Sequence, residues 1–314
     1  MAQALQVAAL TPVDRRANFA RLSLRWCRRM NARALFFCGL LALLCACAGG
    51  PTAVTNPSPP GPLNPSLPTL FIAGDSTAAA KSSNPEQLGW GAPFANYFAL
   101  ERINIANRAL GGRSSRTFIT EGHWERLLAE LKSGDFVLIQ FGHNDGGGIN
   151  EEPPGSTLPL RARGTLPGLG EETQEIDNVV TKQHEVVHTF GWYVRKMIAD
   201  TRAKGATPII LSLTVRNRWS EGRVERPVNG YRMWDEQIAA AAGVEFVDVT
   251  AIIADRYEAL GEEKVARYFL PDRIHTTIAG ADFNARCVVD GLKKVTKPRL
   301  FSYLLPRSPR EKIR

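Results

Sequence analysis

Thr69-Leu-Phe-Ile-Ala-Gly-Asp-Ser-Thr-Ala-Ala79 is the stretch that decides the fold. A short apolar run ends in Gly74-Asp75-Ser76, which predicts a buried strand, a tight turn and the start of a helix. Glycine lets the backbone turn sharply, so the Ser76 hydroxyl is left at the carboxyl end of the strand beside free N–H groups. The stretch half meets the G-x-S-x-G nucleophile elbow, because Ala78 stands at the second glycine position. Asp75 is expected to be a structural turn residue.

Strand-like and helix-like segments alternate along the chain from this point. Short apolar runs predict strands at 69–73, 103–107, 136–141, 208–213 and 245–249. Helical patterns lie at 90–99, 121–132, 184–204, 230–242, 250–260 and 278–294. Glycines after two of these patterns, at 205 and 243, are expected to be left-handed caps. The alternation predicts one α/β domain with a doubly wound, flavodoxin-like sheet of about five parallel strands and helices on both faces.

Two long irregular stretches, 146–183 and 214–227, interrupt this alternation. Each leaves the carboxyl end of a predicted strand, where the ligand site of a doubly wound sheet lies. Loops of this length in a compact domain are usually functional. We therefore expect them to form the walls of a substrate groove.

The N-terminal part predicts export. Seven of the 39 basic residues, but one of the 31 acidic residues, lie in residues 1–46, so the basic excess belongs mainly to this leader. Arginines precede the apolar run 34–44, which is typical of a signal peptide and too short for a comfortable membrane span. Met30 is an alternative start. Without the leader the charge is close to neutral, which argues against a nucleic-acid partner.

Leu44-Cys45-Ala46-Cys47 looks like a bacterial lipobox, in which cleavage before Cys47 exposes that residue for lipidation. A plain signal peptide cut near Ala46 or Ala48 is the alternative. Residues 51–68 contain seven prolines, which favours an extended stalk. We therefore divide the chain into a leader at 1–47, a linker at 48–68, a domain at 69–295 and a tail at 296–314. The expected location is the periplasm or outer membrane of a bacterium, with secretion if Cys47 is not lipidated and a lipid anchor as the sole membrane contact.

Three further motifs follow predicted strands or precede the last helix. They are the glycine-rich run Asn107-Arg-Ala-Leu-Gly-Gly-Arg-Ser-Ser-Arg116, the run Gln140-Phe-Gly-His-Asn-Asp145, and Pro271-Asp-Arg-Ile-His-Thr276. Adjacent glycines let backbone N–H groups approach a ligand, and Asn144 supplies an amide at the same rim. Asp272 lies three residues before His275, a spacing at which the carboxylate can orient the imidazole.

Together, these four motifs in this order resemble the blocks of the SGNH (GDSL-type) hydrolases over about residues 69–295. The forms Gly-Asp-Ser-Thr-Ala, Gly-Gly-Arg-Ser-Ser-Arg, Phe-Gly-His-Asn-Asp and Asp-x-x-His-Thr are similar to the rhamnogalacturonan acetylesterase group. The resemblance implies Ser76 as nucleophile, His275 as general base and then acid, and Asp272 as its orienting carboxylate. It implies an oxyanion hole made of the Ser76 and Gly112 N–H groups and the Asn144 amide, with no metal or other cofactor.

The expected substrate is an acetylated pectic polysaccharide, whose uronates are anionic. Cationic and aromatic side chains in the predicted rim loops are candidate substrate contacts: Arg113, Arg116, His143, Arg216, Arg218 and Trp219. Trp90 and Trp192 are weaker candidates for sugar stacking, with a core role as the alternative. The polar stretch 146–183 does not suggest the broad apolar surface of a lipase, although an SGNH esterase or lipase acting on other acyl esters is the alternative.

Three other functions compete with this interpretation. His184-Glu-Val-Val-His188 matches the H-E-x-x-H zinc protease motif, and on a helix both histidines would share a face. Val194 stands where the extended motif has its third histidine, and a catalytic zinc needs three protein ligands. Gly-Asp-Ser and Gly-His-Asn-Asp superficially resemble the Gly-Asp and Gly-Asn-His metal-binding motifs of metallophosphoesterases. That function is disfavoured because His143 precedes Asn144, which is the wrong order. A non-catalytic carbohydrate-binding protein is disfavoured because all three triad positions are occupied.

Overall fold

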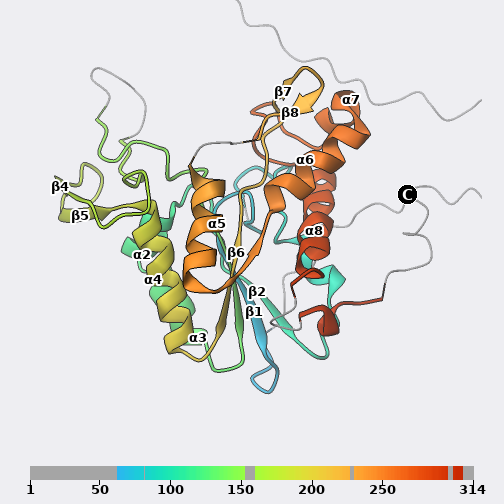
Figure 1. Ribbon diagram of the computed structural model, residues 1–314, viewed down its shortest axis with the longest axis horizontal. Helices are drawn as coiled ribbons and strands as arrows, with labels where there is room; N and C mark the ends of the chain where they lie inside the picture. The colour runs from blue at the N-terminus through green and yellow to red at the C-terminus, as the bar shows by residue number, and fades with distance from the viewer. Residues whose placement is uncertain (1–61, 81, 153–159, 227–229, 296–299, 307–314) are drawn as a thin grey trace, which may run out of the picture. The chain divides into compact units, whose positions relative to one another are not determined.

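A five-stranded parallel sheet forms the centre of the structure, a computed structural model (Figure 1). Its strands are β1 (Thr69–Gly74), β2 (Asn104–Asn107), β3 (Phe136–Gln140), β6 (Thr207–Leu211) and β9 (Glu245–Val247), in the order β2-β1-β3-β6-β9. All four neighbouring pairs are parallel. From β1 the chain adds β2 on one side and then β3, β6 and β9 on the other. This is the flavodoxin-like strand order, as predicted.

Residues 62–306 are described by the structure, apart from 81, 153–159, 227–229 and 296–299. They belong to one compact unit. The predicted leader at 1–47 with Cys47, most of the linker at 48–68 and parts of the tail at 296–314 lie outside the described residues. Within the described ranges, no helix is both long and apolar enough to cross a membrane.

Two layers of helices cover the sheet. One face packs against α2 (Ser115–Thr120), α3 (His123–Glu130), α4 (Phe190–Ala203) and α5 (Tyr231–Ala242). The other packs against the 3₁₀ helix η1 (Pro93–Tyr97), α6 (Val249–Leu260), α8 (Ile278–Leu292) and the 3₁₀ helix η2 (Leu300–Tyr303), and Figure 1 shows α6 and α8 across the sheet from α4. The short helix α7 (Glu262–Ala266) precedes the last loop before α8.

Alternation along β1 explains why both faces are apolar. Leu70 and Ile72 belong to one core cluster, while Phe71 and Ala73 belong to the other, and all four are fully buried. Successive side chains of a strand point to opposite faces, so a continuous apolar run is expected in a sheet covered on both sides.

Several predicted helices need correction. The pattern at 90–99 forms only η1, and the pattern at 121–132 corresponds to α3, preceded by the unpredicted α2. Gly122 separates them in a left-handed conformation, with φ of 74°. The pattern at 184–204 is a strand, β5 (His184–His188), followed by α4, which begins after Thr189 caps the Trp192 N–H. The predicted left-handed caps at Gly205 and Gly243 are confirmed, with φ of 71° and 60°.

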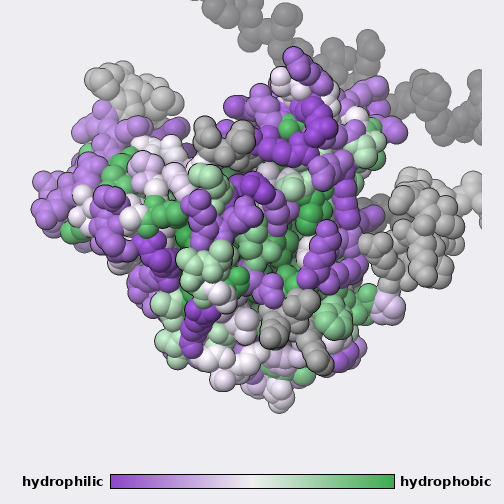
Figure 2. Space-filling model, viewed as in Figure 1, coloured by the Kyte–Doolittle hydropathy of each residue, from purple (hydrophilic) through white to green (hydrophobic). Residues whose placement is uncertain are grey.

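Two hairpins form within or at the end of the long stretches predicted as irregular. β4 (Thr173–Asp177) pairs with β5, and β7 (Trp219–Ser220) pairs with β8 (Arg223–Val224). On the face shown in Figure 2, hydrophilic residues prevail over both hairpins. Both insertions leave the carboxyl end of the sheet, as β3 and β6 precede them.

Candidate active site

The turn that follows β1 presents Ser76. The Asp75 carboxylate accepts hydrogen bonds from the backbone N–H and the hydroxyl of Thr77, at 2.8 and 2.9 Å. Its carbonyl accepts from the N–H groups of Ala78 and Ala79. These bonds close a tight turn around the half-buried Ser76, and Asp75 is a turn residue, as predicted.

Three polar side chains from two distant segments meet at this turn. His275 Nε2 lies 2.8 Å from Ser76 Oγ, and His275 Nδ1 lies 2.6 Å from Asp272 Oδ2. The other oxygen of Asp272 accepts the backbone N–H groups of Ile274 and His275, both at 2.9 Å. The loop between α7 and α8 therefore fixes the carboxylate, and the carboxylate fixes the imidazole.

The surroundings of Asp272 keep it charged. Partial burial acts to raise the pKa of Asp272, but the hydrogen bonds from the His275 side chain and from two backbone N–H groups outweigh it and lower that pKa. An ionised carboxylate on Nδ1 leaves Nε2 facing the hydroxyl as an acceptor. This is the geometry in which an imidazole can take a proton from serine.

Two loops bring hydrogen-bond donors to the same place. Leu110 N–H donates to the Gly74 carbonyl, and a Cβ added to Gly111 would lie 3.8 Å from Ser76 Cβ, so the glycine pair lies beside the serine. Gly112 has φ of 76°, a conformation that favours glycine. Asn144 is buried and donates one amide N–H to the Arg113 carbonyl at 3.0 Å. A side-chain amide has two N–H donors, so the second can donate to a substrate.

His143 and Arg216 interact through their charges with each other and with Asp75, the residue before Ser76. Burial lowers the pKa of His143, and the charges of Asp75, Arg216 and His275 also act on it. His143 Nε2 lies 3.2 Å from Thr214 Oγ1. Burial also lowers the pKa of the half-buried Arg216, with a further contribution from Arg218. Within the described ranges, neither arginine forms an ion pair, so both can receive an anion.

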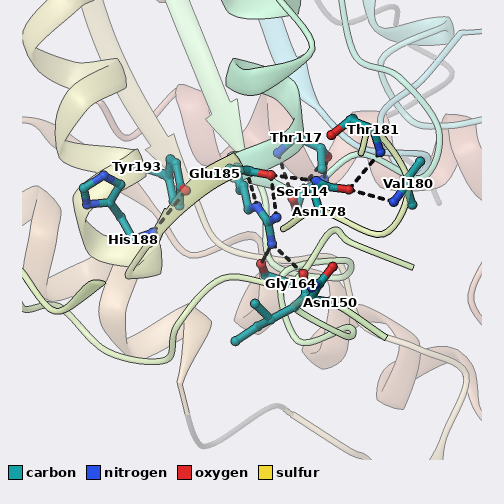
Figure 3. Close-up of polar contacts among 12 residues, drawn as sticks. Ser114, Thr117, Asn150, Gly164, Asn178, Val180, Thr181, Glu185, His188 and Tyr193 are labelled. Atoms are coloured by element: carbon teal, nitrogen blue, oxygen red, sulfur yellow. Dashed lines mark hydrogen bonds and ion pairs between the residues drawn. The ribbon is translucent and has the colours of Figure 1, made fainter. Parts of the chain in front are cut away.

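The other two predicted arginines have protein partners. Arg113 pairs with Glu121 on the surface, at 2.8 Å. Arg116 is fully buried, binds both oxygens of Glu185 at 2.7 and 2.8 Å, and donates to the carbonyls of Ile149 and Gly164. Figure 3 shows Glu185 and Gly164 within this network. The expectation that Arg116 contacts substrate is therefore corrected, because its guanidinium is committed to the fold.

The three tryptophans predicted as sugar contacts have partners within the protein. Trp90 is fully buried and donates to Gln140 at 2.7 Å, so it belongs to the core. Trp192 stacks on His188 with ring centroids 3.8 Å apart. Trp219 lies on β7, half-buried, where it donates to Asn217 and packs against the core cluster. A contact between Trp219 and a sugar stays a prediction.

The H-E-x-x-H motif lies on β5 instead of a helix. Glu185 points to Arg116, while His184 is exposed beside Glu175 and Asp177 of β4, and His188 stacks on Trp192. Among the residues that the structure describes, no three His, Cys, Asp or Glu side chains gather as a set of metal ligands. The motif is therefore part of a structural hairpin.

Sequence reasoning missed two charged residues near the site. Asp145 is buried and accepts hydrogen bonds from the N–H and hydroxyl of Ser115. Arg163, half-buried in the insertion, is influenced by the charges of Asp145 and Asp75. Asp145 could have been found from the sequence, because it follows Asn144 in the same motif. Arg163 could not, because it lies in a stretch without any periodic pattern.

Residues 72–283 match the GDSL-like lipase/acylhydrolase family. The chain belongs to this family. It is 37% identical over 213 residues to a rhamnogalacturonan acetylesterase of Emericella nidulans, covering 68% of this chain and 80% of the relative. It is 29% identical over 243 residues to a probable rhamnogalacturonan acetylesterase, YesY, of Bacillus subtilis, covering 76% and 98%.

Among solved structures, Bacillus subtilis YxiM aligns with a TM-score of 0.57 and 25% identity, over 73% of this chain and 56% of that chain. With the two acetylesterase relatives, this supports the predicted SGNH hydrolase of the rhamnogalacturonan acetylesterase group. The chain is thus a carboxylic ester hydrolase.

Proposed function

We propose that this SGNH hydrolase is a serine esterase that removes O-acetyl groups from a pectic, rhamnogalacturonan-like polysaccharide. The observation that carries the chemistry is the line of contacts from Ser76 Oγ through His275 to Asp272, at 2.8 and 2.6 Å. An isolated serine hydroxyl is a weak nucleophile, and an adjacent oriented base activates it.

In the proposed reaction, His275 Nε2 takes the Ser76 proton as Oγ attacks the acetyl carbonyl. The charge that develops on the carbonyl oxygen is stabilised by the Ser76 and Gly112 N–H groups and the second N–H of Asn144. His275 then returns the proton to the sugar oxygen, which leaves as an alcohol. Water, activated by the same imidazole, hydrolyses the acetyl-enzyme and releases acetate. Asp272 holds the imidazole in the tautomer that the cycle needs.

The relatives' names and the unpaired arginines support the pectic substrate. Arg216 and Arg218 lie on the loop after β6, and Arg216 is close enough to His143 and Asp75 for their charges to interact. A uronate carboxylate can accept hydrogen bonds from a guanidinium, often as a two-point contact. The hydrophilic hairpins near the insertions also favour a carbohydrate over a long acyl chain (Figure 2).

Acetate release tests this proposal. The purified protein should deacetylate acetylated rhamnogalacturonan and p-nitrophenyl acetate, with and without EDTA, and should act poorly on octanoyl esters. Acetylated xylan serves as a neutral polymer of comparable size. A preference for octanoyl esters with no action on acetylated pectin would contradict the substrate but not the triad, whereas chelator-sensitive peptide cleavage would contradict both.

A further inference from the structure

The two loops that supply the proposed oxyanion donors come from strands that are not neighbours. β2 and β3 flank β1, and Ser76 follows β1 between them. Gly112 lies on the loop after β2 and Asn144 on the loop after β3. The sheet holds the two strands through β1 and does not pair them directly, so contacts between the loops act on the spacing of these two donors beyond the ends of the strands.

Side chains of two successive residues make those contacts. Asn144 donates to the Arg113 carbonyl at 3.0 Å. Asp145 Oδ1 accepts the Ser115 N–H at 2.9 Å and the Ser115 hydroxyl at 2.5 Å. Ser115 is three residues beyond Gly112, and both Asp145 and Ser115 are buried. Asp145 therefore holds the second loop to the first, immediately beside the donor amide.

Neighbouring elements hold Asp145 itself in place. Its carbonyl accepts the Thr165 N–H at 2.9 Å. The next two residues are glycines that lie close to other side chains: a Cβ on Gly146 would lie 3.3 Å from the Tyr231 hydroxyl oxygen, and one on Gly147 would lie 3.0 Å from Arg163 Nε. The loop cannot shift far without moving these groups.

A buried acid at this position is costly. Asp145 Oδ2 has no hydrogen-bond partner among the described residues, and burying such a group opposes folding. Among the described residues, the two bonds that Oδ1 accepts from Ser115 are side-chain contacts that offset this cost. From this geometry we infer that Asp145 is a positioning residue, which sets the distance between the Gly112 and Asn144 donors through Ser115. The inference rests on the proposed esterase function.

Steady-state kinetics on p-nitrophenyl acetate test the inference. Asp145→Ala removes both bonds and should lower kcat by about 10- to 100-fold with KM within about threefold, because misplaced donors weaken only the transition state. Asp145→Asn keeps an oxygen that can accept from Ser115, so it should retain kcat to within about fivefold. Asp135→Asn is the matched control, since Asp135 is an equally buried acid that accepts the Thr69 N–H at the opposite end of the sheet, and its kcat should stay within about twofold.

A double-mutant cycle separates positioning from a general structural role. If Asp145 acts through the donors, then Asp145→Ala should cost much less in a protein that already carries Asn144→Ala than in the wild type. Ser115→Ala removes the 2.5 Å bond alone and should show a smaller loss of kcat with the same non-additivity. If Asp145→Ala does not fold, Ser115→Ala replaces it in the double-mutant cycle.

Two results would overturn the inference while the proposed function stands. One is an active wild type, impaired by Asn144→Ala, whose Asp145→Ala and Ser115→Ala variants keep full kcat. The other is a pair of losses that simply multiply in the cycle. A wild type that hydrolyses no ester would overturn the proposed function, and this inference with it.

Discussion

Asp145 has a protonation state that should be visible in stability as well as in catalysis. Burial raises its pKa to about 7, partly offset by the hydrogen bonds from Ser115, and the charge of Asp75 raises it further. An acid whose pKa is higher in the folded state binds its proton more tightly when folded. Its contribution to stability is therefore full below the unfolded pKa of about 4 and declines as pH rises to about 7.

Asp145→Asn should consequently unfold at higher temperature than the wild type at pH 8, because the variant has no charge to bury. The difference should shrink on acidification and vanish near pH 4, where the wild-type carboxyl is protonated in both states. Thermal unfolding of both proteins at one-unit intervals from pH 4 to 8 measures it. A difference that stays constant over this range would show that the carboxyl does not titrate as described. Burial also raises the pKa of Asp235, so Asp235→Asn should show the same trend.

The contact between Asp272 and His275 could be predicted from the sequence, whereas the buried ion pair of Arg116 could not. Asp272 and His275 lie three residues apart, so their contact follows from local geometry. Arg116 belongs to a recognisable motif, yet its partner Glu185 is 69 residues away in a segment whose pattern predicts a helix. Its burial therefore became apparent only in the structure.

Among the secondary-structure elements, the largest difference between prediction and structure is at residues 184–188, which were predicted as helix and form the strand β5. Val187, Val194, Met197 and Ile198 fit a helical stripe, and all are buried, but only the last three lie on α4. The strand β5 exists because it pairs with β4 and lays Glu185 against Arg116, contacts that a local pattern cannot reveal. The spacing of apolar residues alone does not distinguish a short strand from the first turn of a helix.

The ion pair of Arg116 should anchor the insertion to α2. Arg116→Met leaves the carboxylate of Glu185, which is 15% exposed, without its partner and should destabilise the protein by roughly 3–5 kcal/mol. Adding Glu185→Met should restore part of this loss, because the unpaired charge disappears while the carbonyls of Ile149 and Gly164 still lack their donor. Urea unfolding measures the stability, and limited proteolysis within residues 146–183 reports on the insertion.

The surface pair of Arg113 and Glu121 provides the matched control. Their side chains are 39% and 37% exposed, so Arg113→Met should cost less than about 1 kcal/mol. Equal losses for Arg113→Met and Arg116→Met would contradict the anchoring role.

For the whole molecule, the fold was predictable because the sheet strands are short, apolar and regularly separated by helices. That alternation predicts a doubly wound parallel sheet, and both cores follow from strands that are apolar on each face. The hairpins and the contacts between loops depend on pairings across the chain, so they lay beyond a local pattern.

Charge at the rim should matter for the polymer more than for a small ester. Arg216→Gln combined with Arg218→Gln should raise the KM for acetylated rhamnogalacturonan, by about 3- to 10-fold at low salt, because two cations near the polyanion are lost. Lys204→Gln combined with Lys294→Gln, in exposed turns before β6 and after α8, removes the same two charges elsewhere and is the control for net charge.

Raising salt should weaken wild-type binding more than binding by the double variant. Equal salt sensitivity of the two proteins would argue against these arginines as uronate contacts.

The proposed lipid anchor is a separate prediction. If Cys47 is the lipidated residue, the mature chain should begin at Cys47 and carry acyl groups, and Cys47→Ser should release the enzyme from membranes. Mass spectrometry of the mature N-terminus in the native host measures this. An unmodified terminus at Ala48 or Gly49 would contradict it.

The most direct test of the account is kcat for p-nitrophenyl acetate in Ser76→Ala beside Asn144→Ala. If Ser76 is the nucleophile, its loss should lower kcat by about 10⁶, whereas loss of one oxyanion donor should lower it by about 10² to 10³. Circular dichroism confirms that each variant is folded. A folded Ser76→Ala protein with wild-type kcat would contradict the proposed triad.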